Sequence, residues 1–124
     1  MKLYLAGPMR GIPEFNFPAF HAAAARLRDL GHVVFNPAEK DIERWGTIAA
    51  GGNTTGSEDE LETKLGLKKG EAIRICLGDD LEWICAHADG IAMLPGWQNS
   101  KGALAEKATA EALGLKVIYL SGGQ

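Results

Sequence analysis

The amino-terminal part of the chain contains the stretch KLYLAGP (residues 2–8), a short apolar run that a glycine and a proline stop. A run of this kind, bounded by turn residues, is typical of a buried parallel strand. Residues 17–30 follow it with a proline in the first turn and an alanine run, which favours a helix. A second apolar run at 32–35 then ends at an Asn-Pro pair. This order of strand, helix and strand predicts the beginning of a doubly wound α/β sheet.

The second half of the chain predicts two more strands with a helix between them. The strands are residues 90–94 and 115–120, and the helix is the alanine-rich segment 100–113. Right-handed crossovers then give a small Rossmann-like or flavodoxin-like parallel sheet of about four strands, in the order 2-1-3-4 with helices on both faces. The loops 7–15 and 95–102 border the crevice at the carboxyl ends of the first and third strands, where such sheets bind ligands.

The middle of the chain predicts shorter elements. Residues 39–45 and 58–67 are candidates for short helices, and the Gly/Thr/Ser-rich residues 46–58 predict a loop, which we interpret as a lid over a ligand. Residues 70–77 predict a helix that is interrupted at Gly78.

A further helix is expected directly after this interruption, with Asp79 or Asp80 as its cap. Four of its apolar residues have the i, i+3, i+4, i+7 spacing of a core-facing stripe: Leu81, Ile84, Cys85 and Ala88. This spacing predicts that Cys85 belongs to the core.

Composition and charge exclude several classes of function. With 124 residues, the chain is expected to form a single domain over residues 1–124. The net charge of −3 argues against a polymeric nucleic acid as partner, and no run approaches the roughly 20 apolar residues that span a membrane. Cys76 and Cys85 lack CxxC spacing, which favours reduced thiols and a cytoplasmic location. The three histidines show no metal-ligand spacing, so we expect neither a metal nor a cofactor.

The turn after the first strand has the composition of an anion site. Gly7 allows the backbone to approach an anion closely, and the Arg10 guanidinium can bind phosphate oxygens in a fork. Met9 and Gly11 complete this turn. An ordinary strand-to-helix turn with a surface arginine explains the same residues about equally well.

The segment PGWQNSKGALAE (residues 95–106) opens the late helix, so its free N–H groups and the positive end of the helix dipole are available to an anion. Ser100 is either an anion contact or only the N-cap. Gly102 is a poor helix former, which suggests that its position requires a small residue. Trp97, beside Asn99, either stacks on a base or covers the edge of the core.

Glu106 is the most informative single residue. On a helix it shares a stripe with three apolar residues, Ala103, Ala110 and Leu113. A carboxylate that faces inward requires partners or a chemical role, and the alternative is a carboxylate tied to backbone. Asp80 is the natural second carboxylate, since two carboxylates that face a sugar divide the work of nucleophile and acid. Tyr4 either holds Glu106 through its hydroxyl or is simply a core tyrosine.

At these residues the chain resembles the nucleoside 2-deoxyribosyltransferase superfamily. The stretch YLAGP (residues 4–8) is similar to its opening Tyr-x-Ala-Gly-Pro, and residues 80–91 resemble its middle segment. The stretch GALAE (residues 102–106) resembles the Gly-x-x-x-Glu motif that holds the nucleophile. The resemblance implies cleavage of an N-glycosidic bond with Glu106 as nucleophile, in a homodimer or higher homo-oligomer.

Two features are similar to the 2′-deoxynucleoside 5′-monophosphate N-glycosidase branch of this superfamily. They are a serine, Ser100, six positions before Glu106, and an Arg-Gly pair after the first strand. Serine and arginine attract a phosphate, which an acid would repel. The phrase PGWQNSKGA (residues 95–103) also resembles an uncharacterised phage and bacterial family of the same fold, whose substrates the resemblance does not imply.

The expected function is hydrolysis or transfer at the N-glycosidic bond of a nucleoside 5′-monophosphate or nucleoside, with the 2′-deoxy form preferred. The expected catalytic residues are Glu106, Asp80 and Tyr4. The expected substrate-binding residues are Gly7, Met9, Arg10, Gly11, Asn36, Trp97, Asn99, Ser100 and Gly102. The alternatives are a non-catalytic nucleotide sensor on the same fold, a nucleoside deoxyribosyltransferase and a ribo-specific phosphoribohydrolase.

Overall fold

The computed structural model describes residues 1–46 and 56–121. Its helices and strands are, in chain order, β1 (Lys2–Ala6), α1 (Phe17–Asp29), β2 (Val33–Phe35), α2 (Pro37–Trp45), α3 (Glu58–Leu65), α4 (Glu71–His87), β3 (Gly90–Met93), α5 (Lys101–Ala112) and β4 (Lys116–Tyr119). Short 3-10 turns at Pro13–Asn16 and Trp97–Asn99 lead into α1 and α5.

The four strands form one parallel sheet in the order β2-β1-β3-β4, which confirms the predicted topology. In the centre of the sheet, Tyr4 of β1 is aligned with Phe35 of β2 and Ile91 of β3. Because parallel strands end at one edge of a sheet, the loops after β1 and β3 lie next to each other. Leu94, just past β3, donates its backbone N–H to the carbonyl of Ala6.

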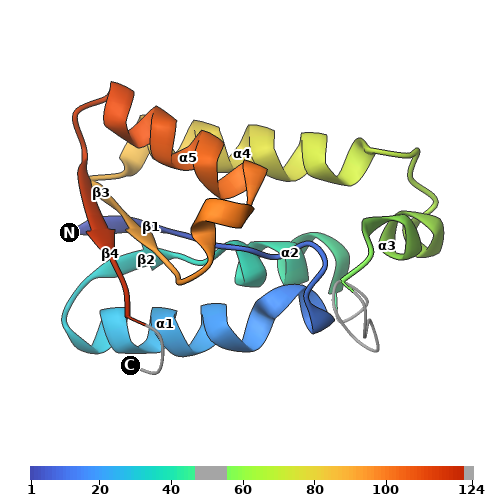
Figure 1. Ribbon diagram of the computed structural model, residues 1–124, viewed down its shortest axis with the longest axis horizontal. Helices are drawn as coiled ribbons and strands as arrows, with labels where there is room; N and C mark the ends of the chain where they lie inside the picture. The colour runs from blue at the N-terminus through green and yellow to red at the C-terminus, as the bar shows by residue number, and fades with distance from the viewer. Residues whose placement is uncertain (47–55, 122–124) are drawn as a thin grey trace.

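The alternation of side chains along β1 creates two hydrophobic layers. Leu3 and Leu5 pack with α1 on one face of the sheet. Tyr4 and Ala6 pack on the other face with residues of α4 and α5, among them Ile84. Figure 1 shows α1 below the sheet and α4 and α5 above it. The hydroxyl of Tyr4 therefore points toward the helices that carry the two predicted carboxylates.

The helices α2 and α3 extend beyond the carboxyl ends of the strands (Figure 1). Asn36 starts α2 as its N-cap, since its Oδ1 accepts the backbone N–H of Ala38 at 3.0 Å. Ser57 caps α3 in the same way. These two helices add side walls to the crevice that the sheet alone leaves open.

The helix α4 corrects the prediction of a break at Gly78. It is continuous from Glu71 to His87, and neither Asp79 nor Asp80 caps it. A glycine inside a helix costs about 1 kcal/mol relative to alanine, and the packing of a 17-residue helix offsets this. The residues of α4 that are buried are Ala72, Asp80 and Ile84, which are spaced by multiples of four. Cys85 lies about 100° away from Ile84 around the helix and is exposed, so its predicted place in the core is wrong.

The predicted loop at 46–58 lies largely outside the described residues, since only residue 46 and residues 56–58 belong to them. Glu58 is already the first residue of α3. In the described part of the chain, no helix combines the length and the apolar character that crossing a membrane requires.

Candidate active site

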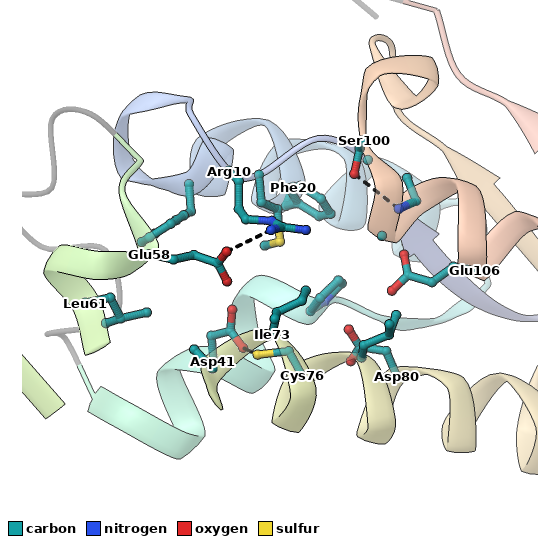
Figure 2. Close-up of a pocket in the computed structure, with 18 of the residues that line it drawn as sticks. Arg10, Phe20, Asp41, Glu58, Leu61, Ile73, Cys76, Asp80, Ser100 and Glu106 are labelled. Carbon is teal, nitrogen blue, oxygen red and sulfur yellow. Dashed lines mark hydrogen bonds and ion pairs between the residues drawn. The ribbon is translucent and has the colours of Figure 1, made fainter. Parts of the chain in front are cut away.

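A pocket lies at the carboxyl ends of β1 and β3, where the topology predicts a ligand site. It holds about 740 Å³ of empty space, part of it open to solvent, and its walls come from the turn after β1 and from α2, α3, α4 and α5. Eight predicted residues line it: Tyr4, Gly7, Met9, Arg10, Asp80, Ser100, Gly102 and Glu106. The structure thus brings Arg10, from the turn after β1, and Glu106, from α5, into one cavity (Figure 2).

Glu106 lies at one end of the pocket and is held by Tyr4. Its side chain faces inward, as its helical stripe predicts, and the residue is only 7% exposed. The hydroxyl of the fully buried Tyr4 donates a hydrogen bond of 2.7 Å to Glu106 Oε2. Burial and the nearby charges of Glu106 and Asp80 raise the pKa of Tyr4 well above its ordinary value, so Tyr4 keeps its proton and remains a donor.

Asp80 faces Glu106 across this end of the pocket (Figure 2). It is 6% exposed, and its Oδ1 is buried without a hydrogen-bond partner among the described residues. Its place on the inward stripe of α4, and not a capping role, brings it here. An unpaired buried oxygen costs free energy unless a ligand or a proton satisfies it.

The two carboxyl groups together hold protons more tightly than isolated acids. Burial raises the pKa of Asp80 to about 6, although the Tyr4 hydroxyl and the Arg44 charge partly oppose this. Burial and the charge of Asp80 raise the pKa of Glu106 well above its usual range, and the hydrogen bond from Tyr4 opposes the rise. Two like charges that face each other in a buried site repel, so the pair retains one proton near neutral pH.

The amino terminus of α5 forms the adjacent wall. Ser100 Oγ accepts the N–H of Ala103 at 3.1 Å, so Ser100 is the N-cap. A Cβ placed on Gly102 would meet only Ser100 Oγ, at 3.9 Å, so packing within the protein does not explain this glycine. A Cβ on Gly7, by contrast, would lie 2.7 Å from the Cβ of Leu94, so the close approach of two loops explains Gly7 without any ligand.

Arg10 lies toward the opposite end of the pocket and already has a partner. Its Nη1 forms an ion pair of 3.0 Å with Oε1 of Glu58, the first residue of α3. The Arg10 side chain is 48% exposed and that of Glu58 21%. Sequence reasoning missed Glu58, because an isolated glutamate at a helix start gives no sign of which loop it will contact.

A second group of polar residues, also missed, forms the floor between these two ends. Asp41 Oδ1 accepts from Arg44 Nη1 at 2.7 Å and from Cys76 Sγ at 3.4 Å. Burial raises the pKa of Asp41 to about 6, although the Arg44 charge opposes this. Burial and the charge of Asp41 raise the pKa of the Cys76 thiol, which therefore stays protonated. Asp41 and Cys76 come from α2 and α4, and no sequence spacing connects them.

Four of the predicted substrate-binding residues do not line the pocket: Gly11, Asn36, Trp97 and Asn99. The backbone N–H of Gly11 donates to the carbonyl of Gly56 at 3.0 Å. The Asn36 amide is occupied by the cap of α2 and by His21 Nδ1 at 3.2 Å.

Trp97 packs at the edge of the core, the alternative that the sequence left open for it. Its ring lies 5.7 Å from that of Tyr119 and 5.3 Å from Lys107 Nζ. Asn99 is exposed. Trp97 is therefore not in a position to stack on a base in this pocket.

The arrangement suits chemistry at a carbon that bears a leaving group. One end offers two facing carboxyl groups that hold a proton more tightly than isolated acids, and a hydroxyl donor that orients one of them. The rest of the pocket offers the amino terminus of a helix and an arginine. No group of three or more His, Cys, Asp or Glu side chains in the described ranges is placed to hold a metal ion.

Comparison with known proteins identifies one family. No curated protein and no solved structure matches the chain. One family model matches residues 1–119, which include every residue of the pocket described above. The chain therefore belongs to the family described as Domain of unknown function (DUF4406).

Proposed function

We propose that the protein hydrolyses the N-glycosidic bond of a nucleoside 5′-monophosphate, with a preference for the 2′-deoxy form. The observation that carries this proposal is the buried Glu106–Tyr4–Asp80 group, which opens on the same cavity as Arg10 and the amino terminus of α5. The resemblance to the nucleoside 2-deoxyribosyltransferase superfamily supports the same conclusion independently of the geometry.

In the first step, a Glu106 oxygen attacks C1′ of the sugar and the bond from C1′ to the base nitrogen breaks. Asp80 supplies the proton that the departing base requires, which is possible because its pKa is raised to about 6 and the pair shares a proton. In the second step, water attacks C1′ of the glycosyl ester and gives its proton to Asp80. Glu106 is released as a carboxylate, and the products are free base and sugar 5-phosphate.

Tyr4 fixes the orientation of the nucleophile. Its hydrogen bond to Oε2 leaves Oε1 of Glu106 available for attack. It also stabilises the ionised form of Glu106 against the burial and the repulsion that favour protonation. Burial and the charge of Asp80 raise the pKa of Glu106 well above its usual range, so in this proposal the proton of the pair has to move to Asp80 before Glu106 attacks.

The phosphate group binds between the amino terminus of α5 and Arg10 in this proposal. Free backbone N–H groups at the start of α5 and the helix dipole attract the anion. The position of Gly102 has room for a ligand, because, its own helix backbone and chain neighbours aside, the nearest described atom to a Cβ built there is Ser100 Oγ, at 3.9 Å. The sugar then spans the distance to Glu106.

The direct test is incubation of the protein with all common ribo- and deoxyribonucleoside 5′-monophosphates, followed by chromatography for free base. We expect base release that Glu106→Gln abolishes. Glu111→Gln is the matched control, because Glu111 lies on the same helix and its exposed carboxylate pairs with Lys107 outside the pocket. Release of base from the free nucleosides at the same rate would contradict a phosphate subsite between Arg10 and the amino terminus of α5.

The same assay separates the alternative functions. Added acceptor base that appears in a new nucleoside or nucleotide indicates a deoxyribosyltransferase. Nucleotide that binds to both wild type and Glu106→Gln without base release from either indicates a sensor. Equal affinity for all nucleotides and for buffer salts, without turnover, would contradict the proposed function altogether.

A further inference from the structure

We propose that Glu58 is the resting counter-ion of the phosphate subsite, and that an anion which binds to Arg10 drives a proton onto the Glu58 carboxylate. This inference rests on the proposed function, because it concerns the subsite that would hold the substrate's phosphate. It makes substrate binding dependent on proton uptake and identifies Glu58 as a residue that determines which anions the pocket accepts.

The geometry places Glu58 where a phosphate oxygen would bind. Its Oε1 lies 3.0 Å from Nη1 of Arg10, the distance of a charge-assisted hydrogen bond. Figure 2 shows the two side chains meeting across the pocket, with Ser100 on the far wall. In the empty protein the guanidinium is therefore already neutralised by a carboxylate.

This ion pair is held in place by the backbone on both sides. The N–H of Gly11, next to Arg10, donates to the carbonyl of Gly56 at 3.0 Å. Gly56 has φ of +70°, and a Cβ there would collide with the backbone of Ile12. The start of α3 is thus closely packed against the arginine turn. Unlike an ordinary surface pair, Glu58 does not have to give up much freedom to contact Arg10.

The charges around Glu58 favour neutralisation when an anion arrives. Burial raises the pKa of Glu58, as do the charges of Glu62 and Asp59 on its own helix, and Arg10 from the turn after β1 opposes the rise. A phosphate that binds to Arg10 removes part of this opposing effect and adds two negative charges nearby. Both changes favour the protonated carboxyl group.

A protonated Glu58 also becomes useful to the ligand. A carboxylic acid can donate its O–H to a phosphate oxygen, whereas a carboxylate can only accept hydrogen bonds. The other acids that line the pocket, Asp41, Asp80 and Glu106, add to its negative charge. Proton uptake at Glu58 relieves the repulsion at the point where a dianion meets Arg10, and the Glu58 side chain need not leave its packed position.

The test is isothermal titration calorimetry at pH 6.5 in buffers of different ionisation enthalpy, which gives the number of protons taken up per bound ligand. The ligands are 2-deoxyribose 5-phosphate, which is common to all deoxynucleotide substrates, and sulfate, a dianion that does not titrate in this range. We expect the wild type to take up protons with both ligands. Glu58→Gln should take up fewer protons with sulfate than the wild type does and should bind sulfate about tenfold more tightly at pH 8.

Asp59→Asn is the matched control, because it removes the same charge from the same helix turn at an exposed position that does not contact Arg10. It should still take up protons with both ligands, although fewer than the wild type because the Asp59 charge helps to raise the pKa of Glu58. Arg10→Gln should lose anion binding while remaining folded, since Arg10 is half exposed.

Equal proton uptake in the wild type and Glu58→Gln would overturn the inference. So would sulfate affinity at pH 8 that Glu58→Gln leaves unchanged. Either result, together with base release that depends on Glu106, leaves the proposed function intact. Absence of anion binding in every variant would overturn both, and proton-coupled anion binding without base release from any nucleotide would overturn the proposed function alone.

Discussion

Two buried glutamates of this protein have opposite environments. Glu62 is 3% exposed and Glu106 is 7% exposed. Both oxygens of Glu62 accept backbone N–H groups, from Gly70 at 3.1 Å and from Ala72 at 2.9 Å. Glu106 has one donor, Tyr4, and faces a second acid with an unpaired oxygen. Burial alone therefore does not distinguish the proposed nucleophile from a structural glutamate; the difference is that the protein leaves the carboxyl pair of Glu106 and Asp80 incompletely hydrogen-bonded.

The structural glutamate has a clear purpose in the fold. The N-cap of α4 is Gly70, which has no side chain to accept the free N–H groups of the first turn. Glu62 reaches across from α3 and supplies both the acceptors and a negative charge at the positive end of the helix dipole. Glu62 thus joins α3 to α4, whereas the carboxyl group of Glu106 points away from α5 into the pocket.

The largest difference expected between Glu62 and Glu106 is in the rate of base release. Glu106→Gln should reduce base release by at least about a thousandfold, because a neutral amide cannot form the glycosyl ester. Glu62→Gln should leave the rate per folded molecule within about twofold, since Glu62 does not line the pocket. The measurement is release of base from the best nucleotide of the panel, at a temperature where both variants are folded. Comparable losses in both variants would break the distinction between the two glutamates.

The second prediction concerns the free energy of unfolding and its dependence on pH. Burial raises the pKa of Asp80 from 3.8 to about 6, so the folded state binds more protons than the unfolded state between these values. Stability therefore falls as pH rises through this window. Asp80→Asn removes the penalty and should stabilise the protein by about 2–3 kcal/mol at pH 8 relative to its effect at pH 4.

Urea denaturation of Asp80→Asn and wild type at both pH values provides the measurement. Base release by this variant should fall by about a hundredfold, because the acid for the leaving base is gone. A variant that is more stable and less active is the expected signature of a strained catalytic group. If Asp80→Asn were destabilised equally at pH 4 and pH 8, Asp80 would be a satisfied structural residue like Glu62.

The third prediction compares the stability of the same two variants, Glu62→Gln and Glu106→Gln. The variant that is the more severe for activity is expected to be the less severe for stability. Glu62→Gln should lower the free energy of unfolding by about 2 kcal/mol, since its NH₂ group would face a backbone N–H that has lost its acceptor. Glu106→Gln should cost nothing at pH 8 or be stabilising, because it removes a buried charge. The measurement is urea denaturation at pH 8, with Glu60→Gln as the control on the same helix, because Glu60 is half-exposed and pairs only weakly, with Lys64 at 3.3 Å. A larger cost at Glu106 than at Glu62 would contradict the comparison.

The sheet could be predicted from sequence because its signals are local. Apolar runs bounded by Gly and Pro fixed the strands, and handed crossovers left one order for them. Glu106 and Tyr4 could be predicted as partners because strand alternation and helical spacing each place one side chain on a known face. Asp80 lines the pocket, but it reaches it from the buried stripe of a continuous helix and not from the helix start at which it was predicted.

The rest of the site could not be predicted because it depends on how α2 and α3 pack. Glu58 contacts Arg10 from 48 positions away in sequence, and Asp41 contacts Cys76 from 35 away. The apolar residues of these helices, Ala38, Ile42 and Trp45 in α2 and Leu61 and Leu65 in α3, do not show which loop each helix will contact, and Ile42 is exposed. Trp97 illustrates an alternative that sequence could not decide, since a base contact and a place at the core edge require the same aromatic residue, and the structure places it at the core edge.

The smallest effect is expected at Tyr4, which joins the sheet to the active carboxylate. Its ring packs on Phe35 at a centroid distance of 5.4 Å, so Tyr4→Phe should keep the core intact. The lost hydroxyl leaves Glu106 without its donor, which favours the protonated and inactive form. We therefore expect kcat to fall about tenfold with little change in KM, and the acidic limb of the pH–rate profile to move to higher pH. If the variant changed KM alone, or lowered kcat equally at every pH, Tyr4 would act by packing and Glu106 would be held, like Glu62, by something other than this hydrogen bond.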